Sequence, residues 1–145
     1  MAIELGKVNV TDLSENSYKA LGIGINRVSN SNGIFAVNYT TLTQAKDSLT
    51  NLIMTRKGER TMQPEFGCDI WELLFEQIDD ESLNIKIENS ILDAVKTWLP
   101  YIQIQQIIFD YDENDIDNNR ISLDIKFALA SNESLTSEIT IDIKN

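Results

Sequence analysis

The chain has 145 residues, of which 42% are hydrophobic and 24% are charged, close to the averages of globular proteins. This length suits one domain with a core of its own. With 12 basic against 23 acidic residues, the formal net charge is -11, which opposes general binding to nucleic acid or to an anionic membrane face. The absence of histidine excludes the commonest general base, the usual nucleophilic triads and the usual zinc sites.

The sequence also bears on where the protein works. No segment reaches the ~20 apolar residues of a membrane span. The first five residues lack the basic opening and hydrophobic stretch of a signal peptide. A single cysteine, Cys68, excludes an internal disulfide and agrees with a reducing compartment. We expect a protein made and kept inside a cell, with no cofactor, metal or membrane partner.

Residues 1–40 are rich in Asn, Ser and Gly and show no sustained hydrophobic period. We expect an irregular N-terminal arm here and a folded domain over residues 41–145. Two apolar islands, 21–25 and 34–37, are each long enough to add a strand or to dock on a neighbour. A frayed tail with one strand and a partner-docking arm remain alternatives.

Helical spacing of apolar residues starts after Thr41, which together with Gln44 matches a capping box. This pattern predicts a helix over about 42–55. A short apolar stripe that includes Trp71 predicts a second, brief helix.

A third helix is the longest predicted. Asp79 or Asp80 can cap its start, and Pro100 ends it after Trp98. One face of it carries Leu83, Ile87, Ile91, Ala94, Val95 and Trp98.

The hydrophobic period then changes from 3.6 to 2. Apolar and polar residues alternate over 121–129, and Ile139, Ile141 and Ile143 repeat the pattern in a candidate last strand over Thr136 to Lys144. Residues 102–111 form a candidate strand before them. Three consecutive strands predict a small C-terminal antiparallel meander with the helices packed on one face, an α+β fold.

The connector between the first two predicted helices, residues 55–68, has an unusual composition. Gly58 and Gly67 allow backbone angles closed to other residues, and Pro64 fixes one torsion between them. Phe66 is expected to pin the connector to the core. A rigid interhelical turn and a functional surface are both consistent with this pattern.

Three cations, Arg56, Lys57 and Arg60, lie on this connector. In an acidic chain they favour ion pairs within or between subunits over phosphate binding. We expect the two arginines to hold the connector through charge-assisted hydrogen bonds to carboxylates or carbonyls.

Two further motifs carry little chemistry. The acidic turn at 110–115 starts like a calcium loop, but Asp115 replaces the required Gly and Ile121 replaces the closing Glu. A solvated turn is therefore expected. Cys68 lies between Gly67 and Asp69, where an anion disfavours a thiolate, so it is expected to be a packing residue.

Paired carboxylates leave glycoside cleavage as the one open enzymatic chemistry, with Glu59 and Glu65 on the connector. Two glutamates on one loop are expected by chance in so acidic a chain, and only Trp71 offers a sugar platform. We expect no catalytic residue.

Residues 48–60, then Pro64 to Asp69 and Leu74-Phe75-Glu76, closely resemble the small baseplate wedge protein of contractile-tailed bacteriophages, whose relatives serve the type VI secretion baseplate. The likeness runs from about Thr43 to the end of the chain. Family members often carry Glu-Pro-Arg where this chain has Leu99-Pro100-Tyr101, so a contact there would be apolar or aromatic.

The resemblance implies a structural subunit of the virion tail baseplate, assembled in the host cytoplasm, which joins wedge proteins to the first sheath ring. Its partners would be other wedge proteins and the baseplate-proximal sheath subunit. The predicted last strand has no proline and little chain after it, so its edge invites a partner strand. A tail-associated lysozyme and a binding adaptor unrelated to phage are the alternatives. The candidate contact residues are Arg56, Lys57, Gly58, Glu59, Arg60, Pro64, Glu65, Phe66, Gly67, Trp98, Pro100, Tyr101, Ile139, Ile141 and Ile143.

Overall fold

A computed structural model of the chain describes residues 20–30, 33–74, 80–110 and 120–144. The chain forms two compact units that divide between Gln44 and Ala45. Within the described residues, no helix is both long and apolar enough to cross a membrane.

The first unit contains an antiparallel hairpin of β1 (Gly22–Asn30) and β2 (Gly33–Asn38), in which Ile23 lies opposite Val37. The two apolar islands therefore pair with each other, so this part of the arm is not irregular and has two strands instead of one. Irregularities in the register on both sides of Arg27 interrupt the alternation, which explains why no strand period is visible in the sequence.

Helix α1 (Thr41–Met54) begins one residue earlier than a cap at Thr41 would require. Thr40 is the cap, because its Oγ1 accepts the N–H of Thr43 at 3.2 Å. The capping box predicted from Thr41 and Gln44 is therefore wrong. Instead, Gln44 Oε1 accepts a hydrogen bond from Asn38 Nδ2 at 3.1 Å, within the first unit.

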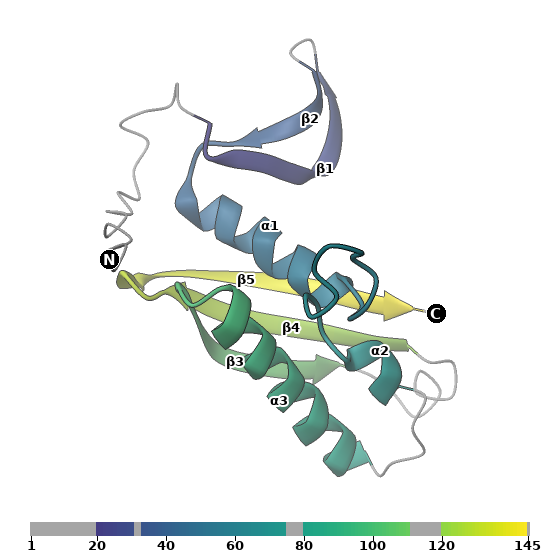
Figure 1. Cartoon of the computed structure of the whole chain (residues 1–145). Helices are drawn as coiled ribbons and strands as arrows, with labels where there is room; N and C mark the ends of the chain where they lie inside the picture. Colours follow the sequence, from purple (N-terminus) through teal and green to yellow (C-terminus); the bar gives the residue numbers. More distant parts are fainter. Residues whose placement is uncertain (1–19, 31–32, 75–79, 111–119, 145) are drawn as a thin grey trace, which may run out of the picture. The chain divides into compact units, whose positions relative to one another are not determined.

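The second unit contains a three-stranded antiparallel sheet in the order β3-β4-β5, formed by β3 (Ile102–Asp110), β4 (Arg120–Leu129) and β5 (Asn132–Lys144) (Figure 1). The predicted meander and the α+β class are confirmed. Strand β5 starts at Asn132, four residues before the predicted start at Thr136. The acidic turn lies mostly outside the described residues.

Two more helices belong to this unit, α2 (Ile70–Leu73) and α3 (Asp80–Trp98), as the sequence predicts. A cap at Asp79 lies outside the described residues. Figure 1 shows α3 running across one face of the sheet. The buried side chains of the sheet come mostly from one face of β4 and β5, together with Ile102 of β3 and Ala128 of β4. Those of the helices include Leu49, Leu52, Ile53, Ile70, Leu83, Ile87 and Ile91.

The other face of β4 and β5 is polar. Ser122 Oγ donates to Asp142 Oδ1, and Thr140 Oγ1 donates to Asp124 Oδ1, both at 2.6 Å. Each bond joins side chains that lie directly opposite each other in the ladder. These pairs fix the register of the last strand on the polar face.

Candidate functional site

Both connector glycines have the backbone that the sequence predicts, with φ of 82° at Gly58 and 123° at Gly67. The two positions differ in their surroundings. A Cβ on Gly67 would lie 2.4 Å from the carbonyl oxygen of Thr55, whereas one on Gly58 would meet nothing within 4 Å. Gly67 is therefore required for close approach as well as for its torsion.

Backbone hydrogen bonds fold the connector into successive turns. The N–H groups of Glu59 and Gln63 donate to the carbonyls of Arg56 and Arg60, both at 3.2 Å. Gly58 N–H then donates to the Pro64 carbonyl at 2.7 Å, which closes the connector across its width. At its base, Cys68 N–H donates to the Thr55 carbonyl at 3.0 Å. The connector is thus internally bonded along its length.

Aromatic rings hold both arginines. The Arg60 guanidinium carbon lies 3.7 Å from the Phe66 ring centroid, and that of Arg56 lies 4.3 Å from Trp71. Phe66 in turn meets Trp98 of α3 edge-on, with the ring centroids 5.3 Å apart, which agrees with its expected role of pinning the connector. The expected arginine–carboxylate bonds are absent from the described residues, so that prediction is corrected to cation–π stacking.

Lys57 makes the ion pair that the arginines do not. Its Nζ donates to Asp69 Oδ2, and this hydrogen bond raises the pKa of Lys57. Asp69 N–H donates to Ser90 Oγ of α3 at 3.1 Å. One surface ion pair therefore ties the connector to the residue before α2, and through it to α3.

Cys68 is a packing residue, as predicted. It is 1% exposed, and burial raises its pKa to about 12. The neighbouring Trp71 indole N–H is buried and has no hydrogen-bond partner among the described residues.

The two connector glutamates lie at the protein surface. Glu59 Oε2 accepts the Arg56 main-chain N–H at 3.1 Å, and both glutamates are exposed. The described residues also contain no group of three or more His, Cys, Asp or Glu side chains that could hold a metal ion.

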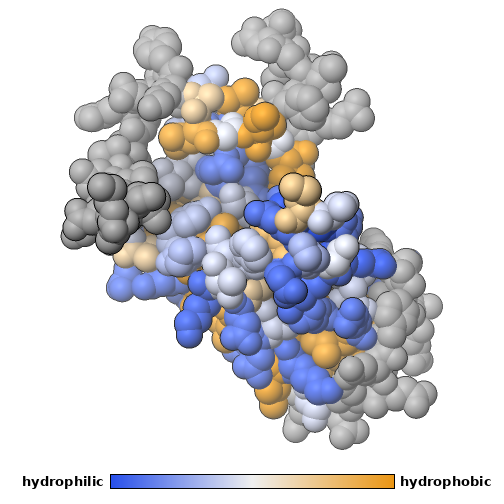
Figure 2. Space-filling view, in the orientation of Figure 1, coloured by the Kyte–Doolittle hydropathy of each residue, from blue (hydrophilic) through white to orange (hydrophobic). Residues whose placement is uncertain are grey.

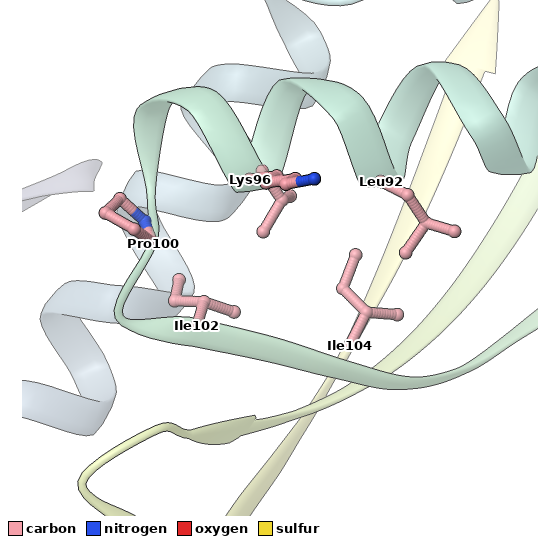
Figure 3. Close-up of a pocket in the computed structure, with 6 residues that line it drawn as sticks. Leu92, Lys96, Pro100, Ile102 and Ile104 are labelled. Atoms are coloured by element: carbon pink, nitrogen blue, oxygen red, sulfur yellow. The ribbon is translucent and has the colours of Figure 1, made fainter.

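Pro100 and Tyr101 connect α3 to β3 beside an apolar groove of about 290 Å³ (Figure 3). The groove lies between the end of α3 and the start of β3 and is lined by Leu92, Val95, Lys96, Pro100, Ile102 and Ile104. Tyr101 is exposed, and its carbonyl accepts the N–H of Ala130 at 2.9 Å. Trp98 belongs to the connector contact instead, through Phe66.

Strand β5 forms one edge of the sheet, and no described strand pairs with its outer side. Ile139, Ile141 and Ile143 are buried, while Thr140 and Asp142 between them are exposed. The apolar side of the strand is therefore used within this unit, and the strand's outer backbone groups are the ones left to be paired.

One face of the N-terminal hairpin is apolar and exposed. Figure 2 shows apolar side chains gathered over β1 and β2. Exposed fractions range from 42% to 67% for five residues, Leu21, Ile23, Ile25, Val37 and Tyr39. The opposite face, at Gly22 and Asn38, packs against Gln44.

Of the predicted contact residues, the structure brings together Arg60, Phe66 and Trp98, while Arg56 stacks separately on Trp71. Pro100, Tyr101 and the isoleucines of β5 lie on other elements. Sequence analysis did not single out Met62, which is 92% exposed on the connector. Its position between Arg60 and Pro64, in a segment with two glycines, is the signal that could have identified it.

Comparison with known proteins identifies relatives of the second unit. A family model described as baseplate wedge protein gp25 matches residues 42–134. Baseplate wedge protein gp25 of Enterobacteria phage T4 is 31% identical over 104 residues, covering 70% of this chain and 74% of the phage protein.

Solved structures show the same fold. A Geobacter sulfurreducens protein described as a candidate tail lysozyme is 24% identical with a TM-score of 0.62, over 75% of this chain and 95% of that chain. A chain of the anti-feeding prophage baseplate is 24% identical with a TM-score of 0.58, over 70% of this chain and 78% of that chain. A chain of the type VI secretion baseplate complex is 15% identical with a TM-score of 0.51, over 70% of this chain and 90% of that chain.

Proposed function

Because this chain belongs to the gp25 family of baseplate wedge proteins, we propose that it links the wedge of a contractile tail to the first ring of the sheath and helps to start sheath assembly. The proposed partners are other wedge subunits and the baseplate-proximal sheath subunit. The proposed place of assembly is the host cytoplasm, before the baseplate becomes part of the virion.

The outer edge of β5 carries this proposal. Strand β5 extends over Asn132–Lys144 and is paired only with β4 among the described strands. Strand addition supplies main-chain hydrogen bonds to a partner without opening the core. A sheath subunit that offers an extended segment would therefore find a template already ordered.

The polar face indicates which N–H groups point outward. In an antiparallel ladder, side chains lie closest together in the non-hydrogen-bonded pairs. The direct side-chain hydrogen bonds Thr140–Asp124 and Asp142–Ser122 indicate that these opposite residues form pairs of this kind. In such pairs the two residues do not exchange backbone bonds. The N–H groups of Thr140 and Asp142 are thus the donors offered to a partner strand.

The test compares Thr140→Pro with Thr140→Val. Both lose the hydroxyl bond to Asp124, but only proline loses the outward N–H. Wedges carrying folded Thr140→Pro should fail to start a sheath, whereas wedges carrying Thr140→Val should start one. Electron microscopy of reconstituted tails measures the outcome, and normal sheaths on Thr140→Pro wedges would refute the proposal.

We also propose that residues 1–40 form a partner-docking arm. Support comes from the exposed apolar face of the hairpin, since contiguous apolar patches on soluble proteins commonly mark contact sites. Ile23→Ser should weaken incorporation into baseplates, while Ala36→Ser, a control on a residue outside the exposed set, should not. Equal incorporation of both variants would count against the arm.

The protein is proposed not to be an enzyme. Glu59 accepts the Arg56 N–H and both glutamates are exposed, so neither has the buried surroundings of a glycosidase acid. The likeness to the candidate tail lysozyme concerns the fold.

A further inference from the structure

The connector concentrates cation–π stacking to an unusual degree. Such pairs occur roughly once per 70 to 80 residues, yet Arg56 and Arg60 make two of them only four residues apart. Stacking fixes the plane of each guanidinium group. It leaves the in-plane N–H donors available, because the ring contacts only the flat face.

These donors are not used inside the connector. Glu59, Glu65 and Asp69 all lie close in sequence, but Glu59 bonds the Arg56 main chain and Asp69 pairs with Lys57. Neither guanidinium is paired with a carboxylate in the part of the chain that the structure describes.

A rigid apolar tip accompanies the two arginines. Met62 lies in the turn that Gln63 N–H closes onto the Arg60 carbonyl, and the Gly58–Pro64 bond braces that turn. At 92% it is the most exposed of the exposed large hydrophobic residues described. Arg and Met are both enriched in the buried centres of protein interfaces. Ordering such groups before binding reduces the entropy lost on docking.

We propose that Arg56, Arg60 and Met62 form a docking surface for an acidic segment of another baseplate subunit. Carboxylates of that segment pair with the two guanidinium forks, and an apolar side chain covers Met62. The chain's net charge of -11 opposes a long polyanion such as nucleic acid. A short protein segment with one carboxylate for each guanidinium group brings far fewer negative charges and is therefore the assigned occupant. This surface is separate from the β5 edge and holds whether or not that edge binds the sheath.

The experiment measures incorporation into baseplates. The chain is co-expressed with the remaining baseplate subunits of its own tail, and each variant competes with an equal amount of tagged wild type. Arg56→Gln/Arg60→Gln should reduce incorporation at least tenfold, corresponding to the loss of about 1.4 kcal/mol. Lys46→Gln/Lys86→Gln, with the same change in charge on two exposed lysines outside the connector, should leave incorporation unchanged. Met62→Ser should reduce it severalfold, and the neighbouring Gln63→Ser should not.

A crosslink then identifies the partner group. Arg60→Lys places a primary amine at the surface, which a carbodiimide joins to a contacting carboxylate as an amide. Mass spectrometry should find Lys at position 60 bonded to Asp or Glu of a different subunit. Because Thr140→Pro is expected to enter baseplates normally and to fail only at the sheath, the two proposals can fail separately.

Three outcomes would overturn the proposal. One is normal incorporation of the double variant with a melting temperature showing that it is folded. Another is a crosslink only to a second copy of this chain. The third is release of the chain by inorganic phosphate or an oligonucleotide but not by chloride at equal ionic strength, which would make this a phosphate site.

Discussion

Gly67 lies against Thr55 so closely that a Cβ added to the glycine would lie 2.4 Å from the Thr55 carbonyl oxygen. That carbonyl accepts the Cys68 N–H, so it cannot move without breaking the base of the connector. We therefore predict that Gly67→Ala lowers the free energy of unfolding by about 3 kcal/mol. Chemical denaturation of the purified protein measures this change.

Gly58→Ala is the matched variant, because Gly58 also has a positive φ but open space around it. Only the torsional cost remains, and a loss of about 1 kcal/mol is expected. Equal losses for the two glycines would show that the close approach at Gly67 contributes nothing.

Arg60 stabilises the connector through the Phe66 ring, so Arg60→Ala should cost about 1 kcal/mol. A buried charge-assisted hydrogen bond would instead cost ~1.5 to 3 kcal/mol. A double-mutant cycle with Phe66→Leu isolates the coupling, which should account for most of the loss. If Arg60→Ala lowers the free energy of unfolding by the same amount in the Phe66→Leu background, Arg60 has another stabilising partner.

The elements of the second unit follow from local hydrophobic period. Ile87 and Ile91 recur at helical spacing and are buried on α3, and Ile139 and Ile141 alternate and are buried on β5. Burial repeats with the geometry of each element, so the sequence carries that information directly.

Contacts across the fold are not encoded in this way. Whether Arg60 meets a carboxylate or the Phe66 ring depends on how the connector closes, because Glu59 and Glu65 are both nearer to Arg60 in sequence than Phe66 is. The cap of α1 was misplaced by one residue for a similar reason. Thr40 and Thr41 both carry hydroxyls, and only the backbone shows that Thr40 bonds the Thr43 N–H.

Peptidoglycan cleavage should be absent. Purified protein incubated with cell walls from acidic to neutral pH should release no soluble fragments, because neither Glu59 nor Glu65 has the buried surroundings of a glycosidase acid. Turnover that Glu59→Gln or Glu65→Gln abolishes would establish the enzymatic alternative.

Burial of Cys68 predicts how stability depends on alkaline pH. Desolvation raises the pKa of the thiol from its ordinary 9.0 to about 12 in the folded protein. The folded state therefore keeps a proton that the unfolded state loses above about pH 9, and the thiol's contribution to stability falls as pH rises from there toward 12. The slope from this group is at most ~1.4 kcal/mol per pH unit. Unfolding of wild type and Cys68→Ala should be compared between pH 7 and 11, since the difference between their free energies of unfolding removes the contributions of tyrosine and lysine.

The stability difference between wild type and variant should be constant below about pH 9 and should shrink above it. A thiol reagent at pH 8 should modify Cys68 only as fast as the protein opens, and rapid modification of the folded protein would contradict the assigned burial.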